Sequence, residues 1–322
     1  MRKNVKKVIA PLLAAAMALS CTVCVSAAED ETIKLTVWGA EEDQDLLKEL
    51  TDKFQEKYAD QKFDIQIGVE SESTAKDTIL TDVEAGADVY AFADDQLTDL
   101  VKAGALLKLD DYAEALQLVD TTLDDVKAAN VEGAIDAASW DSLLEAADKA
   151  GKKVGMTLAS GNLVACVSGT WDAITAQDVF GDGYAATKLP TFTVGDKQVQ
   201  QGSVAGYKYV GVNGYSENSG WAVLLAEYLT NEESQQMFFD QRESGPSNKN
   251  VAASDSVQEN VALAALSAQS EYAQAQKVGG KYWDPAQTFG ELVAQGTLSA
   301  DDDNAIQEAL DNLVDGVTAP VE

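Results

Sequence analysis

The chain has 322 residues, a formal net charge of −31 and no histidine. A charge of this sign and size argues strongly against nucleic acids and anionic membranes as partners, because both are bound through clusters of lysine and arginine. The absence of histidine excludes the common Ser-His-Asp and Cys-His nucleophile systems and the zinc sites that use histidine. The length predicts about two domains.

Residues 1–28 have the pattern of a secretory signal peptide, with a basic start, an apolar run over 8–19 and small residues after it. The run is shorter than the about 20 residues that a membrane span needs. Two processing routes stay open. Small residues at 26–28 suit ordinary cleavage, whereas Ala18-Leu19-Ser20-Cys21 resembles a lipoprotein box in which Cys21 would be lipidated. Either route predicts a mature protein outside the cytoplasmic membrane, lipid-anchored at the cell surface or free in the periplasm or extracellular space.

The first part of the mature chain alternates predicted strands and helices. Residues 32–38 alternate apolar and polar side chains as a strand does, residues 46–58 have helical spacing, and residues 63–69 predict a second strand. A surface helix is expected within 71–85, and a third strand over 87–92. This order predicts an α/β lobe with a mainly parallel core.

The third predicted strand ends in an acidic turn at Asp94 and Asp95, and a helix follows from Leu97. The turn therefore falls at the carboxyl edge of the predicted sheet, which is where ligands bind in open α/β sheets. Further along, we expect a strand at 153–159, a single strand over 203–212 that returns to the first lobe, a helix pair over 218–239 and a last helix over 302–314.

The stretch around this turn resembles a segment of the family 1 bacterial extracellular solute-binding proteins, the maltose-binding group. The residues that carry the resemblance are Gly86, Asp88, Val89, Phe92, Asp95, Gly104, Leu106 and Leu109. "LTVWG" ending at Gly39, "Gly-x-Trp" ending at Trp171, and Trp283 in a loop that enters a helix resemble other parts of the same family. The resemblance implies an α/β, two-lobe periplasmic-binding-protein-like fold (type II) with a crossover hinge. It divides the mature chain into a first lobe of 29–130 and 204–253 and a second lobe of 131–203 and 254–322.

Two blocks of the family pattern are missing, one after Ala134 and one after Ser160, where well-matching segments adjoin abruptly. Our hypothesis is that each block is a few tens of residues long and that the second lobe is incomplete. A divergent subfamily is the alternative.

The resemblance implies the carbohydrate-binding component of an ABC sugar importer, with maltose or maltodextrin as ligand and membrane permease subunits as partners. The aromatic side chains expected to stack on sugar rings are Trp38, Phe92, Trp171 and Trp283, and the carboxylates expected to accept hydroxyl hydrogen bonds are Glu42, Asp43 and Asp95. For Trp38 and Trp283, packing is the alternative role. We expect no enzymatic activity, no cofactor and no metal. Two other interpretations stay open: a remnant that no longer binds, and a glycoside hydrolase, for which abundant acids are weak evidence.

Overall fold

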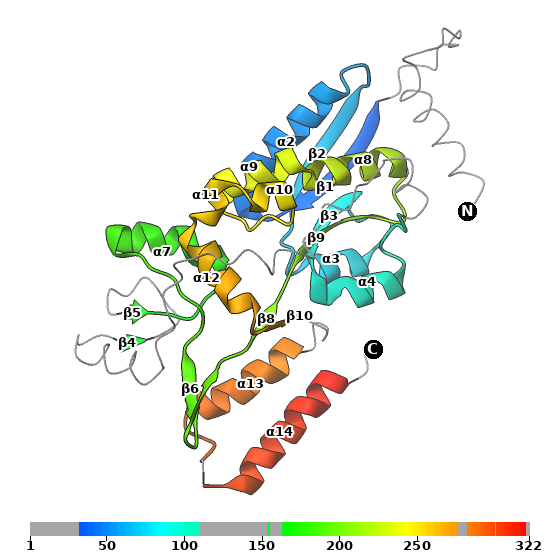
Figure 1. Ribbon diagram of the computed structural model, residues 1–322. Coiled ribbons are helices and arrows are strands. Elements are labelled where there is room, and N and C mark those ends of the chain that lie inside the picture. The colour runs from blue at the N-terminus through cyan, green and yellow to red at the C-terminus, as the bar shows by residue number, and fades with distance from the viewer. Residues whose placement is uncertain (1–31, 110–152, 155–162, 276–281, 300, 320–322) are drawn as a thin grey trace.

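The computed structural model describes residues 32–109, 153–154, 163–275, 282–299 and 301–319 (Figure 1). The predicted signal peptide, Cys21 and both junctions of the proposed missing blocks lie outside these residues. The predicted strand at 153–159 is described only at β4, Lys153–Val154, which pairs with β5, Leu163–Ala165.

The largest sheet has four strands in the order β2-β1-β3-β9. The strands are β1, Ile33–Gly39; β2, Phe63–Val69; β3, Val89–Ala93; and β9, Lys208–Val212. β1 runs parallel to both β2 and β3, and β9 is antiparallel to β3. The predicted parallel core is therefore present, with one antiparallel strand added at its edge.

The single strand expected over 203–212 was a wrong prediction, because the chain changes sheets within it. β8, Ser203–Ala205, pairs with β10, Ala273–Ala275, whereas β9 pairs with β3. Between the two strands, the Tyr207 carbonyl accepts a hydrogen bond from the Asp94 backbone N–H at 3.0 Å. Because Ala93 lies opposite Lys208, this bond continues the pairing of β3 with β9 by one residue, and the change of sheet falls between Ala205 and Tyr207.

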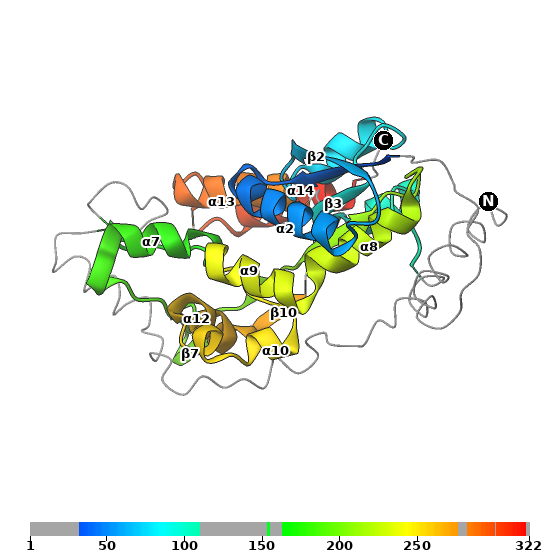
Figure 2. The same cartoon turned by 90° about the horizontal axis from the view of Figure 1, so that it is seen from above.

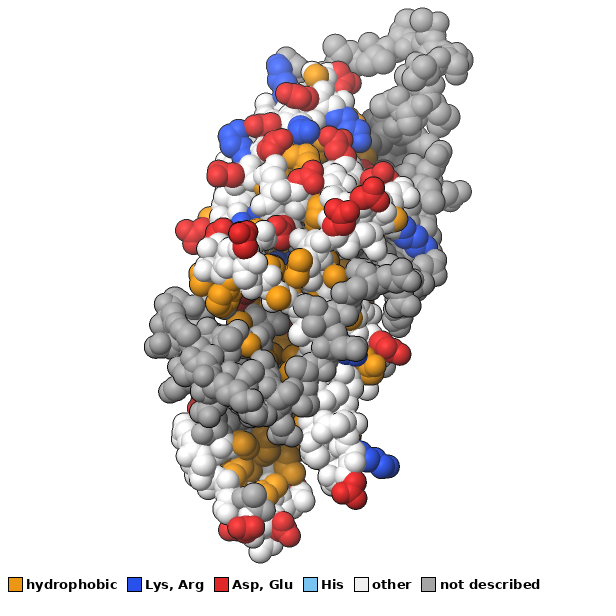
Figure 3. All heavy atoms as spheres, turned by 60° about the vertical axis from the view of Figure 1, so that its left-hand side comes forward, with side chains coloured by type: hydrophobic (Ala, Val, Ile, Leu, Met, Phe, Trp, Pro, Cys, Tyr) orange, Lys and Arg blue, Asp and Glu red, His pale blue; other side chains and the backbone are white. Residues whose placement is uncertain are grey.

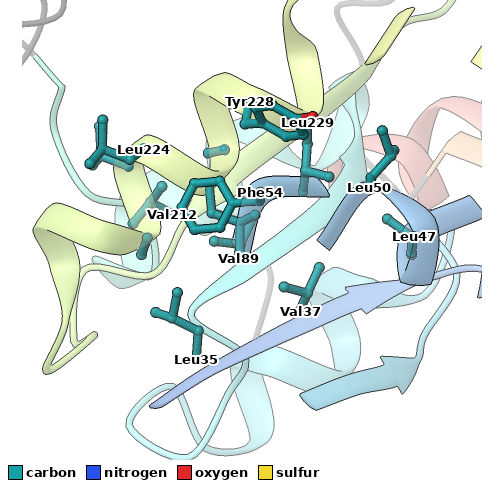
Figure 4. Close-up of a cluster of buried hydrophobic side chains, with 14 of the residues drawn as sticks. Leu35, Val37, Leu47, Leu50, Phe54, Val89, Val212, Leu224, Tyr228 and Leu229 are labelled. Carbon is teal, nitrogen blue, oxygen red and sulfur yellow. The ribbon is translucent and has the colours of Figure 1, made fainter. Parts of the chain in front are cut away.

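Helices cover both faces of this sheet, because successive side chains of a strand point to opposite faces. On one face lie α2, Gln44–Lys57; α8, Ser219–Thr230; and α9, Glu232–Arg242; on the other lie α3, Ala75–Thr81, and α4, Leu97–Ala103. Leucines and Phe54 form one stripe of α2 and bury it completely at Leu50 and Phe54. Figure 4 shows the resulting core, which includes Leu35, Val37, Leu47, Leu50, Phe54, Val89, Val212, Leu224, Tyr228 and Leu229.

The remaining described elements lie beside and below this layered unit in Figure 1, where α10 and α11 lie next to α9, and α13 and α14 make up the lower part with β6; Figure 2 shows them from above. They are α7, Ala173–Phe180; β6, Thr191–Val194; β7, Lys197–Gln200; α10, Lys249–Ala252; α11, Asp255–Gln258; α12, Val261–Ser270; α13, Trp283–Ala294; and α14, Asp303–Thr318. Among the described residues, the strands outside the large sheet form three separate two-stranded pairs. The lobe boundaries stay a prediction.

Hydrophobic side chains are more exposed in this lower part. In the view of Figure 3 they gather low in the molecule, whereas charged side chains crowd the upper part of that face. Phe192, Val194, Val293 and Val314 are each at least 40% exposed. Within the described ranges, no helix combines the length and the apolar character that a membrane crossing requires.

Candidate functional site

Three polar turns meet at the carboxyl edge of the large sheet. A 3-10 turn, Glu41–Asp43, follows β1, residues 70–74 follow β2, and a second 3-10 turn, Asp94–Gln96, follows β3. Because these three strands are parallel, all three turns lie at one edge, which is the usual ligand position in such sheets. The antiparallel β9 begins at the same edge, with Lys208 opposite Ala93.

Asp95 and Trp283, both predicted from the sequence, are in direct contact. The indole Nε1 of Trp283 donates a hydrogen bond to Asp95 Oδ2 at 3.1 Å, although 188 residues separate them. The other oxygen, Asp95 Oδ1, is buried and has no hydrogen-bond partner among the residues that the structure describes. A buried acceptor without a donor is costly, and more so when it is charged. Asp95 therefore keeps one acceptor that no donor of the described residues uses.

Trp283 contributes an open aromatic surface beside that acceptor. Its side chain is 51% exposed, and Tyr282 meets its ring edge-on at a centroid distance of 5.3 Å. The residue begins α13, as expected for a loop that enters a helix. A ring held on one side with its remaining surface open is the arrangement that stacking on a ligand requires.

Four charged side chains surround Asp43: Lys208, Arg242, Glu42 and Glu72. Arg242 Nε donates a hydrogen bond to Asp43 Oδ1 at 3.1 Å, and the Asp43 side chain is only 20% exposed. Burial raises the pKa of Asp43 above its usual value, while the charges of Lys208 and Arg242 oppose that rise and those of Glu42 and Glu72 add to it. Glu42 itself is exposed.

The turns after β2 and β3 are locked together by hydrogen bonds. The buried Gln96 donates from Nε2 to the backbone carbonyls of Glu72 and Ser73, at 2.8 Å each, and its Oε1 accepts from the Lys76 N–H at 3.1 Å. Lys208 Nζ forms an ion pair with Glu72 Oε1 at 2.6 Å. Burial also raises the pKa of Asp94, and the charge of Asp95 adds to that rise. The edge is thus a fixed framework of carboxylates with two cations.

The predicted aromatic residues Trp38 and Phe92 pack largely against the first lobe. Trp38 is half-buried, with its ring 6.3 Å from that of Tyr90. Gly68 makes room for it, since an added Cβ would lie 2.7 Å from Trp38 Cδ1. Phe92 is 3% exposed and lies between the rings of Tyr90 and Tyr209. Ligand contact by these two residues stays a prediction, and for Phe92 it requires a change in packing.

Trp171 is 80% exposed and lies in a 3-10 turn, Thr170–Asp172, just before α7. The ring folds back over Gly169, where an added Cβ would overlap it. In the described part of the chain, no ring contact or side-chain hydrogen bond joins Trp171 to another predicted ligand residue. The structure therefore brings together Asp95 with Trp283 and Glu42 with Asp43, and leaves Trp171 apart from them.

Sequence reasoning missed Glu72, Lys208, Arg242 and Gln96. Glu72 carried a usable signal, because it lies in an acidic turn directly after a predicted strand. The two cations carried none, since their partners are distant in the sequence. Among the residues that the structure describes, no group of acidic or cysteine side chains is arranged to hold a metal ion. Cys166 is half-buried, and burial raises the pKa of its thiol.

Comparison with known proteins gives one family match and many similar folds. Residues 149–265 match the model of the bacterial extracellular solute-binding protein family. None of the curated proteins matches the chain. A chain solved with acarbose is 25% identical, with a TM-score of 0.70 over 88% of this chain and 98% of that one.

Two further solved structures are similar. A maltodextrin-binding protein from L. casei has a TM-score of 0.70 at 18% identity, covering 89% of this chain and 99% of that chain. A maltose-maltodextrin binding protein from Alicyclobacillus acidocaldarius has a TM-score of 0.69 at 16% identity, covering 88% and 99%. The chain thus has the fold of these solved binding proteins, and residues 149–265 match a bacterial extracellular solute-binding family, in agreement with the resemblance of its sequence motifs.

Proposed function

We propose that this chain binds a maltodextrin-type oligosaccharide outside the cytoplasmic membrane and presents it to the permease subunits of an ABC importer. The observation that supports this most directly is the pair formed by Asp95 and Trp283, with one buried carboxylate oxygen lacking a donor beside an open indole ring.

The chemistry of this pair suits a sugar. Pyranose rings present apolar faces that stack on flat aromatic surfaces and hydroxyls that donate hydrogen bonds to carboxylates. The unpaired Asp95 Oδ1 destabilises the free protein. A ligand hydroxyl that donates a hydrogen bond to this oxygen would remove that cost, and the free energy regained would favour binding. Two of the similar chains are maltodextrin-binding proteins by name, which supports the choice of sugar.

The test is thermal unfolding of the mature chain with and without maltotriose, with cellotriose as the matched control ligand. A ligand that binds only the folded state raises the melting temperature, and at 100 times its dissociation constant it stabilises by about 2.7 kcal/mol. We expect maltotriose to raise the melting temperature and cellotriose to leave it nearly unchanged. A cooperative melt that no malto-oligosaccharide shifts would refute the proposed ligand.

The contribution of Trp283 is tested by isothermal titration calorimetry on two variants. Trp283→Ala removes both the stacking ring and the indole donor, so we expect it to weaken maltotriose binding roughly 10-fold or more. Trp283→Phe retains a ring and loses only the donor, so it should fall between the native protein and Trp283→Ala. Equal affinity in all three folded proteins would exclude Trp283 from the site.

A folded remnant that no longer binds is the second candidate. It is favoured by the three separate strand pairs and the exposed apolar side chains of the lower part. An incomplete lobe leaves such strand edges and apolar surfaces uncovered. A broad or absent thermal transition in the same experiment would support it. The third interpretation is a glycoside hydrolase, and release of reducing sugar from a maltodextrin panel tests it. The matched family and the named similar chains are binding proteins, which argues against this interpretation.

A further inference from the structure

Arg242 is the only arginine after Arg2, and it occupies the last position of α9. Its side chain reaches the turn after β1, where Nε contacts Asp43 Oδ1 at 3.1 Å, and it is 34% exposed. The contact joins residues 199 positions apart. A guanidinium is planar and permanently charged, so it fixes a carboxylate in orientation as well as in charge.

The helix that carries Arg242 is itself held firmly. Phe239 of α9 is buried, and Gln241 Nε2 donates to Glu49 Oε2 of α2 at 3.0 Å. The end of α9 therefore has a defined position relative to α2 and to the turn that precedes it. The packing of α9 on α2, away from the sheet edge, therefore places Arg242 beside Asp43.

We propose that Arg242 is a positioning residue, which holds the Asp43 carboxylate by Oδ1 so that Oδ2 is presented to the ligand as a hydrogen-bond acceptor. The inference rests on the proposed function, because it takes Asp43 as a ligand-binding residue. It goes beyond that function by assigning the orientation and charge of the Asp43 carboxylate to Arg242 at the end of α9.

The charges around Asp43 make the proposal measurable. Lys208 of β9 and Arg242 of α9 favour the ionised carboxylate, whereas burial, Glu42 of the same turn and Glu72 after β2 disfavour it. Lys208 is also paired with Glu72, so its charge is shared. Arg242 is one of the two positive charges that lower the pKa of Asp43. Without it, burial and the charges of Glu42 and Glu72 would raise that pKa further.

The experiment compares the native protein with Arg242→Gln, Arg242→Lys and the control Lys53→Gln. Lys53→Gln removes one positive charge from another contact between α2 and α9, away from the sheet edge. The first readout needs no ligand: NMR titration of the Asp43 side-chain carboxyl. We expect the Asp43 titration to move to higher pH in Arg242→Gln, to stay near the native position in Arg242→Lys, and to be unchanged in Lys53→Gln.

The second readout is maltotriose affinity between pH 5 and pH 8. In Arg242→Gln the loss of affinity on acidification should be larger than in the native protein, by about threefold or more, and Arg242→Lys should restore the native profile. An unmoved Asp43 titration in folded Arg242→Gln overturns the proposal, as does an equal loss of affinity at every pH. If the native protein binds no malto-oligosaccharide, the proposed function fails, and the NMR titration still decides whether Arg242 controls Asp43.

Discussion

Replacing Asp95 with asparagine tests whether its unpaired oxygen is kept for a ligand. In the free protein this change removes a negative charge from a site where Oδ1 is buried without a donor, and the amide oxygen still accepts the Trp283 hydrogen bond. An unsatisfied buried polar group costs about 1–3 kcal/mol, and the cost is larger for a charged group. Part of it remains in Asp95→Asn, because one amide atom is still buried without a partner. We therefore expect the free energy of unfolding to rise by about 1 kcal/mol.

The same change should weaken binding. A hydrogen bond to a charged acceptor contributes about 1.5–3 kcal/mol, so Asp95→Asn should lower maltotriose affinity roughly 10-fold or more. Urea unfolding measures the gain in stability, and calorimetry measures the loss in affinity. The opposite signs are the signature of a site residue that is strained in the free protein.

Asp99→Asn is the matched control. Asp99 is a nearby carboxylate on α4 that lies within 3.7 Å of Lys102 and 3.9 Å of Lys76, so its charge is already compensated. We expect this variant to be slightly less stable than the native protein and to bind maltotriose equally well. Our reasoning would be refuted if Asp95→Asn destabilised the free protein and left affinity unchanged.

The ring of Phe54 has no exposed surface and contacts Tyr58, Phe63 and Tyr228. Phe54→Ala should therefore lower the free energy of unfolding by about 3–5 kcal/mol, measured by urea unfolding. A decrease below about 1 kcal/mol would contradict the core described above. Because the pKa of Asp43 is raised on folding, the folded state holds the proton more readily than the unfolded state. The contribution of Asp43 to stability should therefore grow as pH falls through the raised pKa, and Asp43→Asn should abolish that part of the pH dependence in urea unfolding. Trp171→Ala, at an 80% exposed position, should change the free energy of unfolding by no more than about 0.5 kcal/mol, so any fall in maltotriose affinity would report ligand contact directly.

The hypothesis of two missing blocks stays a prediction, because both junctions lie outside the described residues. The limited extent of the family match, over residues 149–265, is consistent with it. Sequencing the native locus tests it independently of any structure. A continuous gene with these junctions would support a natural deletion, whereas intervening coding sequence would refute one.

Local pattern determined the elements of the first lobe. Alternation predicted β1, helical spacing predicted α2, and the acidic turn at Asp94 and Asp95 was placed correctly after β3. These features are set by side chains within one or two turns of each other, so a single stretch of sequence contains the information. The family motifs predicted the two-lobe fold and a solute-binding role, and they singled out Asp95 and Trp283 as candidate ligand residues.

Tertiary structure alone decided which side chains meet. The chain changes sheets between β8 and β9, because β8 pairs with β10 and β9 pairs with β3, and both partners are distant in the sequence from at least one of the two strands. The contacts of Arg242 with Asp43 and of Trp283 with Asp95 join segments almost 200 residues apart. Such contacts exist only once helices and strands have packed, because packing fixes where the end of α9 and the start of α13 lie. Sequence periodicity carries no record of that placement.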